Sequence, residues 1–214
     1  MEIVLCYAPT TCALVPYVTL TEAGADFEVR RINMRKRDHM SADYLKINPK
    51  HKVPVLVVDA QPLSDNVAIQ SWIARTFPEA NLLPSDPWQE LKAISMLSWC
   101  SSGIHPHLAR INSPAKYCDF PGSEESLRKL AAEQAFENFR IADAMLAGRE
   151  YFFDHFTAVD AHFFWCFRRA LQFELDLSEF KNCLAHFDRM TGRASVQKVF
   201  AFEKEVLAGF AKAA

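Results

Sequence analysis

Apolar side chains are spaced in two different ways along the chain, and the first 77 residues mix both. Short apolar or alternating runs, typical of strands, are separated by segments that repeat apolar residues at helical spacing. The pattern predicts strands at 2–7, 27–33 and 53–58, a short fourth strand after a turn at 59–62, and helices at 12–23, 42–47 and 65–77. Helices between strands require crossover connections, so this part is expected to form an α/β domain.

The rest of the chain is helical in character and begins after a proline-rich stretch. Residues 77–87 read FPEANLLPSDP, with three prolines and little periodicity, which is typical of an interdomain linker. Beyond it the pattern predicts helices at 88–111 with a bend near 103–106, at 123–147, from 157 onward, at 180–190 and at 195–210. We therefore expect an α/β domain at 1–77, a linker at 78–87 and an all-helical domain at 88–214.

Composition and charge narrow the class of protein. Half of the 214 residues are apolar and the formal net charge is -2. A basic stretch at 30–37 is followed at once by Asp38, so we favour a solvated face over an anion site there. Nothing in the charge pattern favours a nucleic-acid partner. The sequence offers neither an apolar run long enough for a transmembrane helix nor a secretory signal, so we expect a cytoplasmic protein without a membrane partner.

The six cysteines form no CxxC pair and no Cys/His spacing suited to zinc, so no metal site is expected. In a reducing compartment most of them should be buried free thiols. Cys12 differs because it follows an expected strand and opens an expected helix, with Thr10 or Thr11 as the cap. The N–H groups and dipole at that end of a helix favour a thiolate. A small buried residue is the competing interpretation, and Pro16 disturbs the first turn.

Two further segments carry groups that could bind a ligand. Val53 and Pro54 open the third strand, one of the few places where a sheet accepts proline, and the sequence leaves the isomer of their peptide bond open. Asp65 and Asn66 start a helix at the edge of the sheet where Cys12 is expected. These two residues either cap the helix, or Asp65 accepts an ammonium group while the helix N-terminus receives a carboxylate.

The helical part contains two motifs. His105 and His107 are two positions apart and do not share a helix face, so they are not expected to bind a metal together. Either could act as the base for a thiol, or be an ordinary hydrogen-bonded histidine. Thr157 and Asp160 have the spacing of a capping box before an almost wholly apolar helix, which is a structural feature.

The chain resembles the glutathione transferase family over nearly its full length. Four stretches carry the resemblance, in the order YAPTTCALVPYVTLTEAG, YLKINPKHKVPVLVVD, LSDNVAIQSWIA and FTAVDAHFF. The chain is most similar to the bacterial, cysteine-type (beta-class-like) branch. The resemblance implies a thioredoxin-like N-terminal domain, an all-helical C-terminal domain and a homodimer. It also implies glutathione as the co-substrate, a small hydrophobic electrophile as the second substrate, and a role in detoxification.

The resemblance further implies roles for single residues. Cys12 matches the active-site cysteine, which contacts the sulfur of glutathione and can form a mixed disulfide with it, and His105 matches a histidine that approaches this sulfur. Val53 matches the residue before a cis-proline, whose backbone pairs with the cysteinyl part of glutathione. The other residues implied to bind glutathione are Pro54, Asp65 and Asn66 at its γ-glutamyl end, Arg35 and Lys52. Thr157 and Asp160 match the folding-related capping box of the family.

Four positions depart from the family pattern. Asp65 stands where Glu or Gln is usual and Asn66 where Ser or Gly is usual, which leaves the affinity for glutathione open. His51 replaces a common Gly and would alter the turn before Val53. Arg169 replaces a frequent Trp, which predicts a more cationic wall of the cleft.

We therefore expect a glutathione transferase that directs the glutathione thiolate at an electrophile, with thiol transfer or peroxide reduction through Cys12 as an extension. No resolving cysteine is evident nearby, so glutathione itself would resolve a mixed disulfide. Two alternatives stay open. One is a non-catalytic binding or regulatory module, and the other is a glutathione-dependent isomerase or dehalogenase on the same scaffold.

Overall fold

The computed structural model describes residues 1–212, which divide into two compact units. The first comprises Met1–Ser85 and the stretch from Gly192 onward, and the second comprises Asp86–Thr191. The limits expected from the sequence, with one helical domain at 88–214, differ from this division at the C-terminal end. The last helix, α9 (Ala194–Lys212), packs on α1 (Leu14–Glu22) and so belongs to the first unit.

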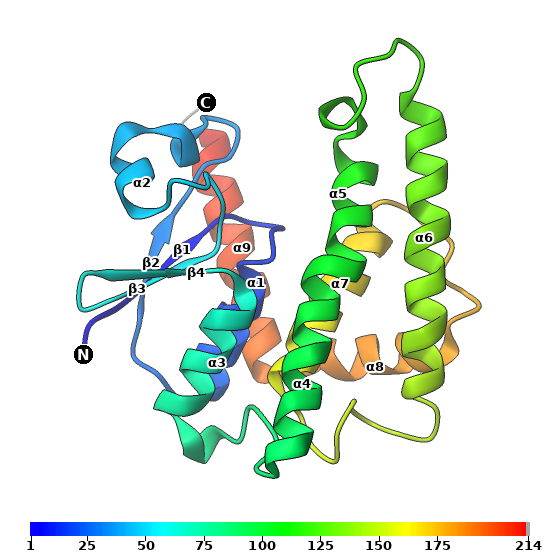
Figure 1. Ribbon diagram of the computed structural model, residues 1–214. Helices are drawn as coiled ribbons and strands as arrows, with labels where there is room; N and C mark the ends of the chain where they lie inside the picture. Colours follow the sequence, from blue (N-terminus) through cyan, green and yellow to red (C-terminus); the bar gives the residue numbers. More distant parts are fainter. Residues whose placement is uncertain (213–214) are drawn as a thin grey trace. The chain divides into compact units, whose positions relative to one another are not determined.

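A four-stranded mixed sheet forms the centre of the first unit (Figure 1). Its strands are β1 (Ile3–Tyr7), β2 (Glu28–Arg31), β3 (Val55–Val58) and β4 (Gln61–Ser64), in the spatial order β2-β1-β3-β4. β1 runs parallel to β2 and antiparallel to β3, and β3 runs antiparallel to β4. The predicted α/β architecture is confirmed. β3 begins later than expected, because Pro54 has no N–H to donate to a neighbouring strand.

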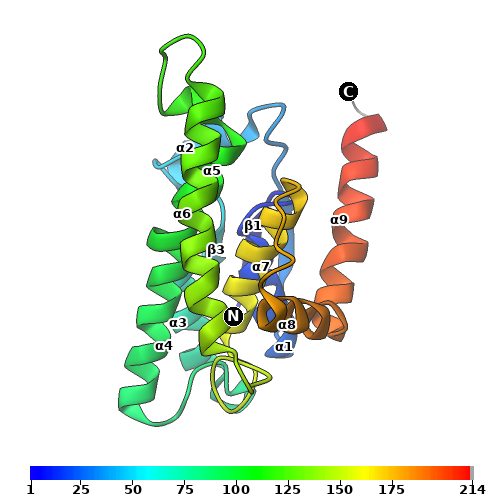
Figure 2. The ribbon, with the colours of Figure 1, turned by 90° about the vertical axis from the view of Figure 1, so that its right-hand side faces the viewer.

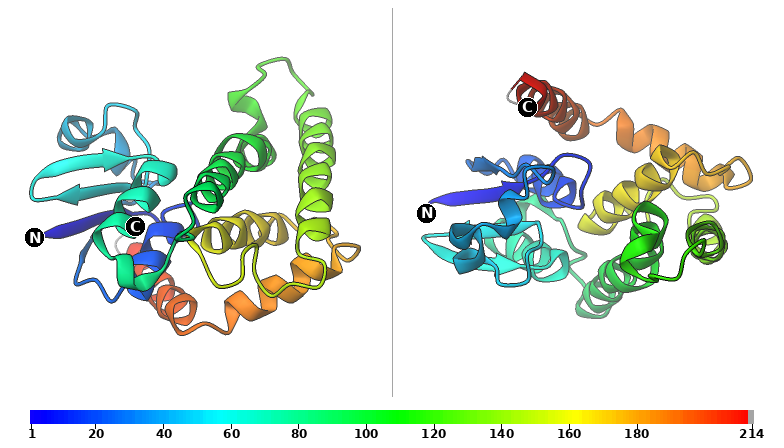
Figure 3. Two further views of the ribbon diagram at one scale, coloured as in Figure 1. Left: turned by 60° about the horizontal axis from the view of Figure 1, so that its bottom comes forward. Right: turned by 90° about the horizontal axis from the view of Figure 1, so that it is seen from above.

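Side chains alternate between the two faces of this sheet. The helices that cover it include α1, α2 (Ala42–Ile47) and α3 (Asn66–Thr76), and two short 3₁₀ helices are η1 (Asp38–Met40) and η2 (Pro78–Ala80). On one face Cys6 and Val55 are paired in register and pack against Tyr44 of α2. On the other face Leu5 and Leu56 are paired and fully buried, and α1 and α3 lie side by side (Figure 3).

Polar contacts tie the C-terminal helix to the first unit. Arg193, just before α9, donates hydrogen bonds of 2.9 and 2.8 Å to the carboxylate of Glu22, and the hydroxyl of Ser195 donates to the same carboxylate. Arg31 of β2 also pairs with Glu205 of α9 at 2.7 Å. These contacts join residues that lie far apart in the sequence, and α9 reaches the turn after β1 as a result.

The second unit is helical. Its helices are α4 (Pro87–Trp99), a π-helical turn (Cys100–Ile104), α5 (His105–Asn112), a 3₁₀ helix η4 (Pro114–Lys116), α6 (Glu124–Met145), α7 (Ala158–Gln172) and α8 (Lys181–Thr191). The π turn lies where the sequence predicts a bend, because Pro106 cannot donate a helical hydrogen bond. α6 packs alongside α5 (Figure 2). Within residues 1–212, no helix combines the length and the apolar character that a membrane span requires.

The capping box predicted at the start of α7 is present. The backbone N–H and the hydroxyl of Thr157 donate to one carboxylate oxygen of Asp160 at 2.8 and 3.0 Å. The other oxygen accepts from the backbone N–H of Phe152 and from Nε2 of His186, both at 3.1 Å. Asp160 is fully buried. It therefore joins α8 and the preceding loop to the start of α7.

Candidate functional site

Cys12 lies in the turn between β1 and α1. The helix begins two residues after it, and Ala13 at the N-cap position has helical backbone angles and no side-chain cap. The hydroxyl of Thr11 donates to the carbonyl of Ala8 at 2.7 Å and accepts from the backbone N–H of Ala13 at 3.3 Å. The expectation that Cys12 occupies the first turn of the helix is therefore wrong. Pro16 accounts for the late start, because it cannot donate to the carbonyl of Cys12.

The thiol of Cys12 is buried against the entry of β3. The residue is 8% exposed, and its Sγ donates a hydrogen bond of 3.5 Å to the carbonyl oxygen of Val53. The peptide bond between Val53 and Pro54 is cis, the isomer that the family resemblance implies. The turn after β1 and the loop before β3 thus bring Cys12 and Val53 together at one end of the sheet.

Burial raises the pKa of the Cys12 thiol to about 12, above its ordinary value of 9.0. Its own backbone N–H, Lys52 and Asn66 lower this pKa to a smaller extent, whereas Asp65 raises it. The sequence predicts a thiolate favoured by a helix N-terminus, and that expectation is not met because desolvation outweighs the nearby donors. At neutral pH the thiol is protonated and serves as a hydrogen-bond donor.

Asn66, the first residue of α3, holds the Cys12 turn in place. Its side-chain Nδ2 donates to the carbonyl oxygen of Cys12 at 3.1 Å, and the backbone N–H of Val15 donates to the same oxygen at 3.2 Å. These two bonds stand in for the helical bond that Pro16 cannot make. The residue is 6% exposed. The side chain of Asn66 is therefore engaged within the protein, beside the thiol.

Asp65 precedes Asn66 at the N-cap position of α3 and points its carboxylate to solvent. It makes no side-chain cap, its φ is 73°, and its side chain is 70% exposed. The carboxylate pairs with the ammonium group of Lys50 and accepts from the hydroxyl of Ser64 at 3.3 Å. Capping therefore does not explain Asp65. Sequence reasoning missed Lys50, although it lies in the NPKHKVP stretch, because side-chain pairing across a turn leaves no periodic signal.

His51 lies in the turn that leads to Val53, at a position where Gly is common in the family pattern. His51 adopts a φ of 57°, in the left-handed region that favours glycine. The carbonyl of Lys52 accepts from the hydroxyl of Tyr44 at 2.7 Å and from Nδ2 of Asn48 at 2.9 Å, so the backbone here is anchored to α2. The side chain of Lys52 is exposed. The turn therefore holds a side-chain-bearing residue in a conformation that glycine adopts at lower cost.

Arg35 lies in the exposed loop after β2. Its backbone N–H donates to Oδ1 of Asn33 at 3.0 Å, which orders the loop. The side chain is exposed, as is that of Lys36. The described contacts do not join Arg35 to Cys12 or to Asp65.

Glu203 of α9 is a site-neighbouring residue that sequence reasoning missed. Although it is 3% exposed, its Oε1 accepts from the hydroxyl of Tyr7 at 2.6 Å and from the backbone N–H of Thr10 at 2.8 Å. Thr10 has a φ of 64° and lies two residues before Cys12. A buried carboxylate with two donors thus supports the turn that carries the thiol. No pattern could reveal this contact, because it joins residues more than 190 positions apart.

His105 belongs to the second unit and begins α5. Its ring packs edge-on against that of Trp165, with 4.5 Å between the ring centroids. Burial, with the charge of His105, lowers the pKa of the neighbouring His162 to about 3, so His162 is neutral. Among residues 1–212, no three His, Cys, Asp or Glu side chains gather closely enough to hold a metal ion.

Residues 5–75 match the family of the glutathione S-transferase N-terminal domain. Glutathione S-transferase GstA of Escherichia coli O157:H7 is 29% identical over 205 residues, which cover 93% of this chain and 98% of that protein. Among solved structures, a bacterial beta-class glutathione S-transferase from Sphingomonas chungbukensis is 27% identical, with a TM-score of 0.82 and coverage of 94% of this chain and 98% of that one. A sphingomonad glutathione S-transferase complexed with glutathione is 26% identical, with a TM-score of 0.83 and the same coverage.

Proposed function

We propose that the chain is a member of the glutathione S-transferase family, that it binds glutathione on its first unit and that it directs the glutathione thiolate at a small hydrophobic electrophile. The observation that carries this proposal is the hydrogen bond between the buried Cys12 thiol and the carbonyl of Val53, beside the cis bond to Pro54. It places a protonated sulfur donor next to a strand entry, where an extended peptide can pair with the backbone. The cysteinyl part of glutathione fits this place.

The γ-glutamyl end of glutathione carries both an ammonium group and a carboxylate. In the proposed complex the ammonium group of glutathione binds the exposed carboxylate of Asp65 and displaces the ammonium group of Lys50. The carboxylate lies at the N-terminus of α3, whose first N–H groups have no side-chain cap. Asn66 contributes its backbone N–H group here, because its side-chain amide already donates a hydrogen bond to the carbonyl of Cys12.

The glycyl carboxylate at the other end of glutathione needs a cation. Lys52 adjoins Val53, and its backbone is anchored by Tyr44 and Asn48. Lys52 is therefore the cation proposed to bind this carboxylate. Arg35, on the exposed loop after β2, is proposed as a second cation that reaches glutathione when the loop closes over it.

The proposed reaction forms a carbon–sulfur bond. Glutathione gives up its thiol proton to solvent, the thiolate attacks the electrophile, and the leaving group departs. Cys12 gives up its hydrogen bond to the carbonyl of Val53 and donates its S–H to the glutathione sulfur instead. This new bond strengthens as negative charge accumulates on that sulfur. His105, which the family resemblance matches to a histidine near this sulfur, is proposed as a further catalytic residue.

Thiol transfer through a mixed disulfide is a second candidate, favoured by the position of Sγ at the proposed glutathione site. It requires Cys12 to ionise before it attacks a glutathione disulfide. Burial raises the pKa of Cys12 and opposes this step. Conjugation needs only the protonated thiol, so it is the function that the site supports best. The protein is proposed to act in detoxification, as a homodimer, in the cytoplasm.

Calorimetric titration with glutathione and a conjugation assay with chlorodinitrobenzene test this function. We expect the wild type to bind glutathione and Cys12→Ala to lose most of the conjugation activity. Cys12→Ser should keep part of this activity, because its hydroxyl still donates a hydrogen bond. If Cys12→Ser is as inactive as Cys12→Ala while the wild type forms a glutathione adduct detectable by mass, the disulfide route replaces conjugation. Absence of glutathione binding would overturn both routes and leave a non-catalytic module.

A further inference from the structure

One buried histidine of the second unit has no role in the site described above. His162 lies on α7 and is fully buried, yet neither of its ring nitrogens has a hydrogen-bond partner within residues 1–212. A neutral imidazole carries one N–H donor and one acceptor nitrogen. Leaving both without a partner in the protein interior costs free energy, so a group of this kind calls for an explanation.

His162 borders the same indole ring as His105. Trp165 follows His162 by three positions on α7, and the centroids of their rings are 6.4 Å apart. The ring of His105 packs edge-on against Trp165, with 4.5 Å between the centroids. The charge of His105 also reaches His162, whose pKa it helps burial to lower. The three rings therefore form one cluster, with His162 at its fully buried end and His105 at its partly exposed end.

The chain before His105 is held firmly. The π-helical turn Cys100–Ile104 leads directly into α5. Trp99 precedes this turn, and its Nε1 donates to Oδ1 of Asn138 on α6 at 2.7 Å. Gly103 allows the close approach, because a Cβ there would lie 2.6 Å from the ring of Trp99. The backbone at His105 is therefore fixed, and the state of its ring depends on its neighbours.

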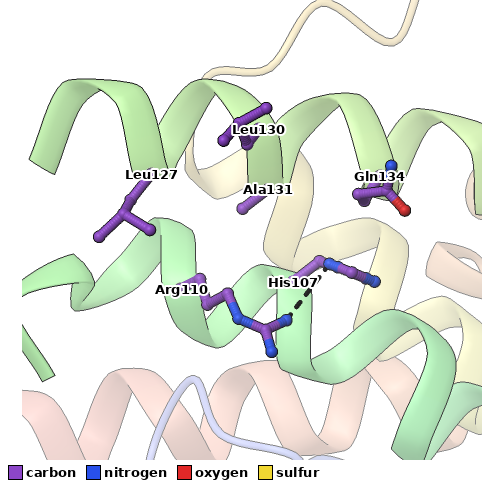
Figure 4. A pocket seen from close by; sticks show the side chains of 6 residues that line it. All are labelled: His107, Arg110, Leu127, Leu130, Ala131 and Gln134. Carbon is purple, nitrogen blue, oxygen red and sulfur yellow. Dashed lines mark hydrogen bonds between the residues drawn. The ribbon is translucent and has the colours of Figure 1, made fainter. Parts of the chain in front are cut away.

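The second histidine of α5 belongs to a different face of the helix. His107 lies on the side of α5 that borders α6, where the guanidinium of Arg110 donates to its Nδ1 at 3.4 Å (Figure 4). His105 and His107 thus face different helices, as their spacing predicts. His105 is therefore the α5 histidine that lies next to His162.

We propose that His162 is a positioning residue, which pairs through one ring nitrogen with the inner ring nitrogen of His105. This inference rests on the proposed function, in which His105 donates from its outer nitrogen to the glutathione sulfur. Because His162 is uncharged, it can donate to a neutral His105 and accept from a protonated one. In both states the outer nitrogen of His105 carries a proton. His162 thereby keeps the donor directed outward.

Nitrogen-15 NMR of the imidazole rings tests the pairing on the full chain without glutathione, in mildly alkaline solution. We expect His105 to be a single tautomer in the wild type and a mixture of the two in His162→Phe, which has no ring nitrogen. His162→Gln, whose amide can still donate, should keep the single tautomer. His155→Phe, which removes an imidazole from the loop before α7, is the matched control and should leave His105 unchanged.

Conjugation kinetics test whether the pairing contributes to the proposed reaction. His162→Phe should lower kcat by about three- to tenfold, the range expected for the loss of one neutral hydrogen bond, and leave the KM for glutathione unchanged. His162→Gln should restore most of kcat. The Phe variant should fold normally, because an apolar ring replaces a buried polar ring that has no partner among the described residues.

Two results would overturn the proposal. One is the same tautomer of His105 in the wild type and in His162→Phe, which would make a buried water the partner of His162. The other is wild-type kcat in His162→Phe. A wild type that binds no glutathione would instead overturn the proposed function, and the tautomers of His105 would still decide whether the two histidines pair.

Discussion

The side-chain amide of Asn66 donates a 3.1 Å hydrogen bond to the backbone carbonyl of Cys12, so the first residue of α3 fixes the turn that carries the thiol. Pro16 creates the need for this bond, because it leaves the Cys12 carbonyl without its regular helical donor. The position of Asn66 also places an amide donor beside the buried sulfur, whose pKa it lowers.

Replacing Asn66 should therefore affect both stability and the thiol. Asn66→Ala leaves a carbonyl short of a donor in a buried turn, and we expect the free energy of unfolding to fall by about 1 to 3 kcal/mol in urea titrations. Asn66→Asp has the same shape, but its carboxylate repels a nearby thiolate, so alkylation of Cys12 by iodoacetamide should be slower than in the wild type. Equal stability and equal alkylation in both variants would contradict the role given to Asn66.

The raised pKa of Cys12 predicts a loss of stability in alkaline solution. Below the ordinary thiol pKa of 9.0 the sulfur is protonated in both the folded and the unfolded chain, and its full contribution is present. As the pH rises from 9.0 towards 12, the unfolded chain ionises first, so the free energy of unfolding falls. The fall should be smaller in Cys12→Ala, measured by urea titration at a series of pH values. The same slope in both proteins would show that Cys12 is not desolvated.

Asp160 should be a main stabilising residue of the second unit. Asp160→Asn presents an amide donor to the N–H of Thr157 or of Phe152, and one of these buried groups loses its acceptor. We expect a loss of about 2 to 4 kcal/mol in the free energy of unfolding. Asp154→Asn is the matched control, because its side chain is 90% exposed and pairs with the neighbouring His155. Similar losses of unfolding free energy in the two variants would show that the capping box has no special role in stability.

Glu203 should support glutathione binding from outside the ligand site. Glu203→Gln keeps the shape but turns a charged acceptor for Tyr7 and Thr10 into a neutral one, so the turn before Cys12 should loosen. We expect weaker glutathione binding by calorimetry together with a loss of about 2 kcal/mol in stability. Glu205→Gln, on the same helix but 66% exposed, should change neither quantity measurably. An unchanged glutathione affinity in Glu203→Gln would contradict this role.

His51→Gly should stabilise the protein. Residue 51 has a φ of 57°, and a left-handed conformation costs a side-chain-bearing residue about 1 to 2 kcal/mol relative to glycine. Nδ1 of His51 is buried without a hydrogen-bond partner among residues 1–212, so little is lost with the ring. Thermal unfolding should therefore shift upward, with the affinity for glutathione kept. A lower melting temperature would mean that the imidazole stabilises the protein by more than the left-handed conformation of residue 51 destabilises it.

The local patterns of the sequence predicted most of the fold. Short apolar or alternating runs located the strands, helical spacing located α2 at 42–47, and the spacing of Thr157 and Asp160 revealed the capping box. Each of these signals acts over a few residues, within the reach of hydrogen bonds along the chain. The resemblance to glutathione transferases added the cis isomer before Pro54, which local pattern left open.

Contacts between distant segments could not be read from the sequence. Glu203 and Lys50 lie at the site only because the chain folds back, and α9 joins the first unit through Arg193 and Glu22. The sequence left the state of Cys12 open between a thiolate and a small buried residue for a related reason. The helix dipole is a local property that a sequence can suggest, but burial depends on the packing of α3 and β3 around the turn, and burial dominates the pKa.

We propose above all that a protonated Cys12 stabilises the thiolate of bound glutathione. The ultraviolet absorbance of thiolates at neutral pH tests it most directly, recorded as a difference between the mixture of protein with glutathione and its separate components. We expect a positive thiolate signal when glutathione binds to the wild type, and a smaller signal in Cys12→Ala at saturating glutathione. Saturated binding without any thiolate signal, or an equal signal in Cys12→Ala, would contradict it.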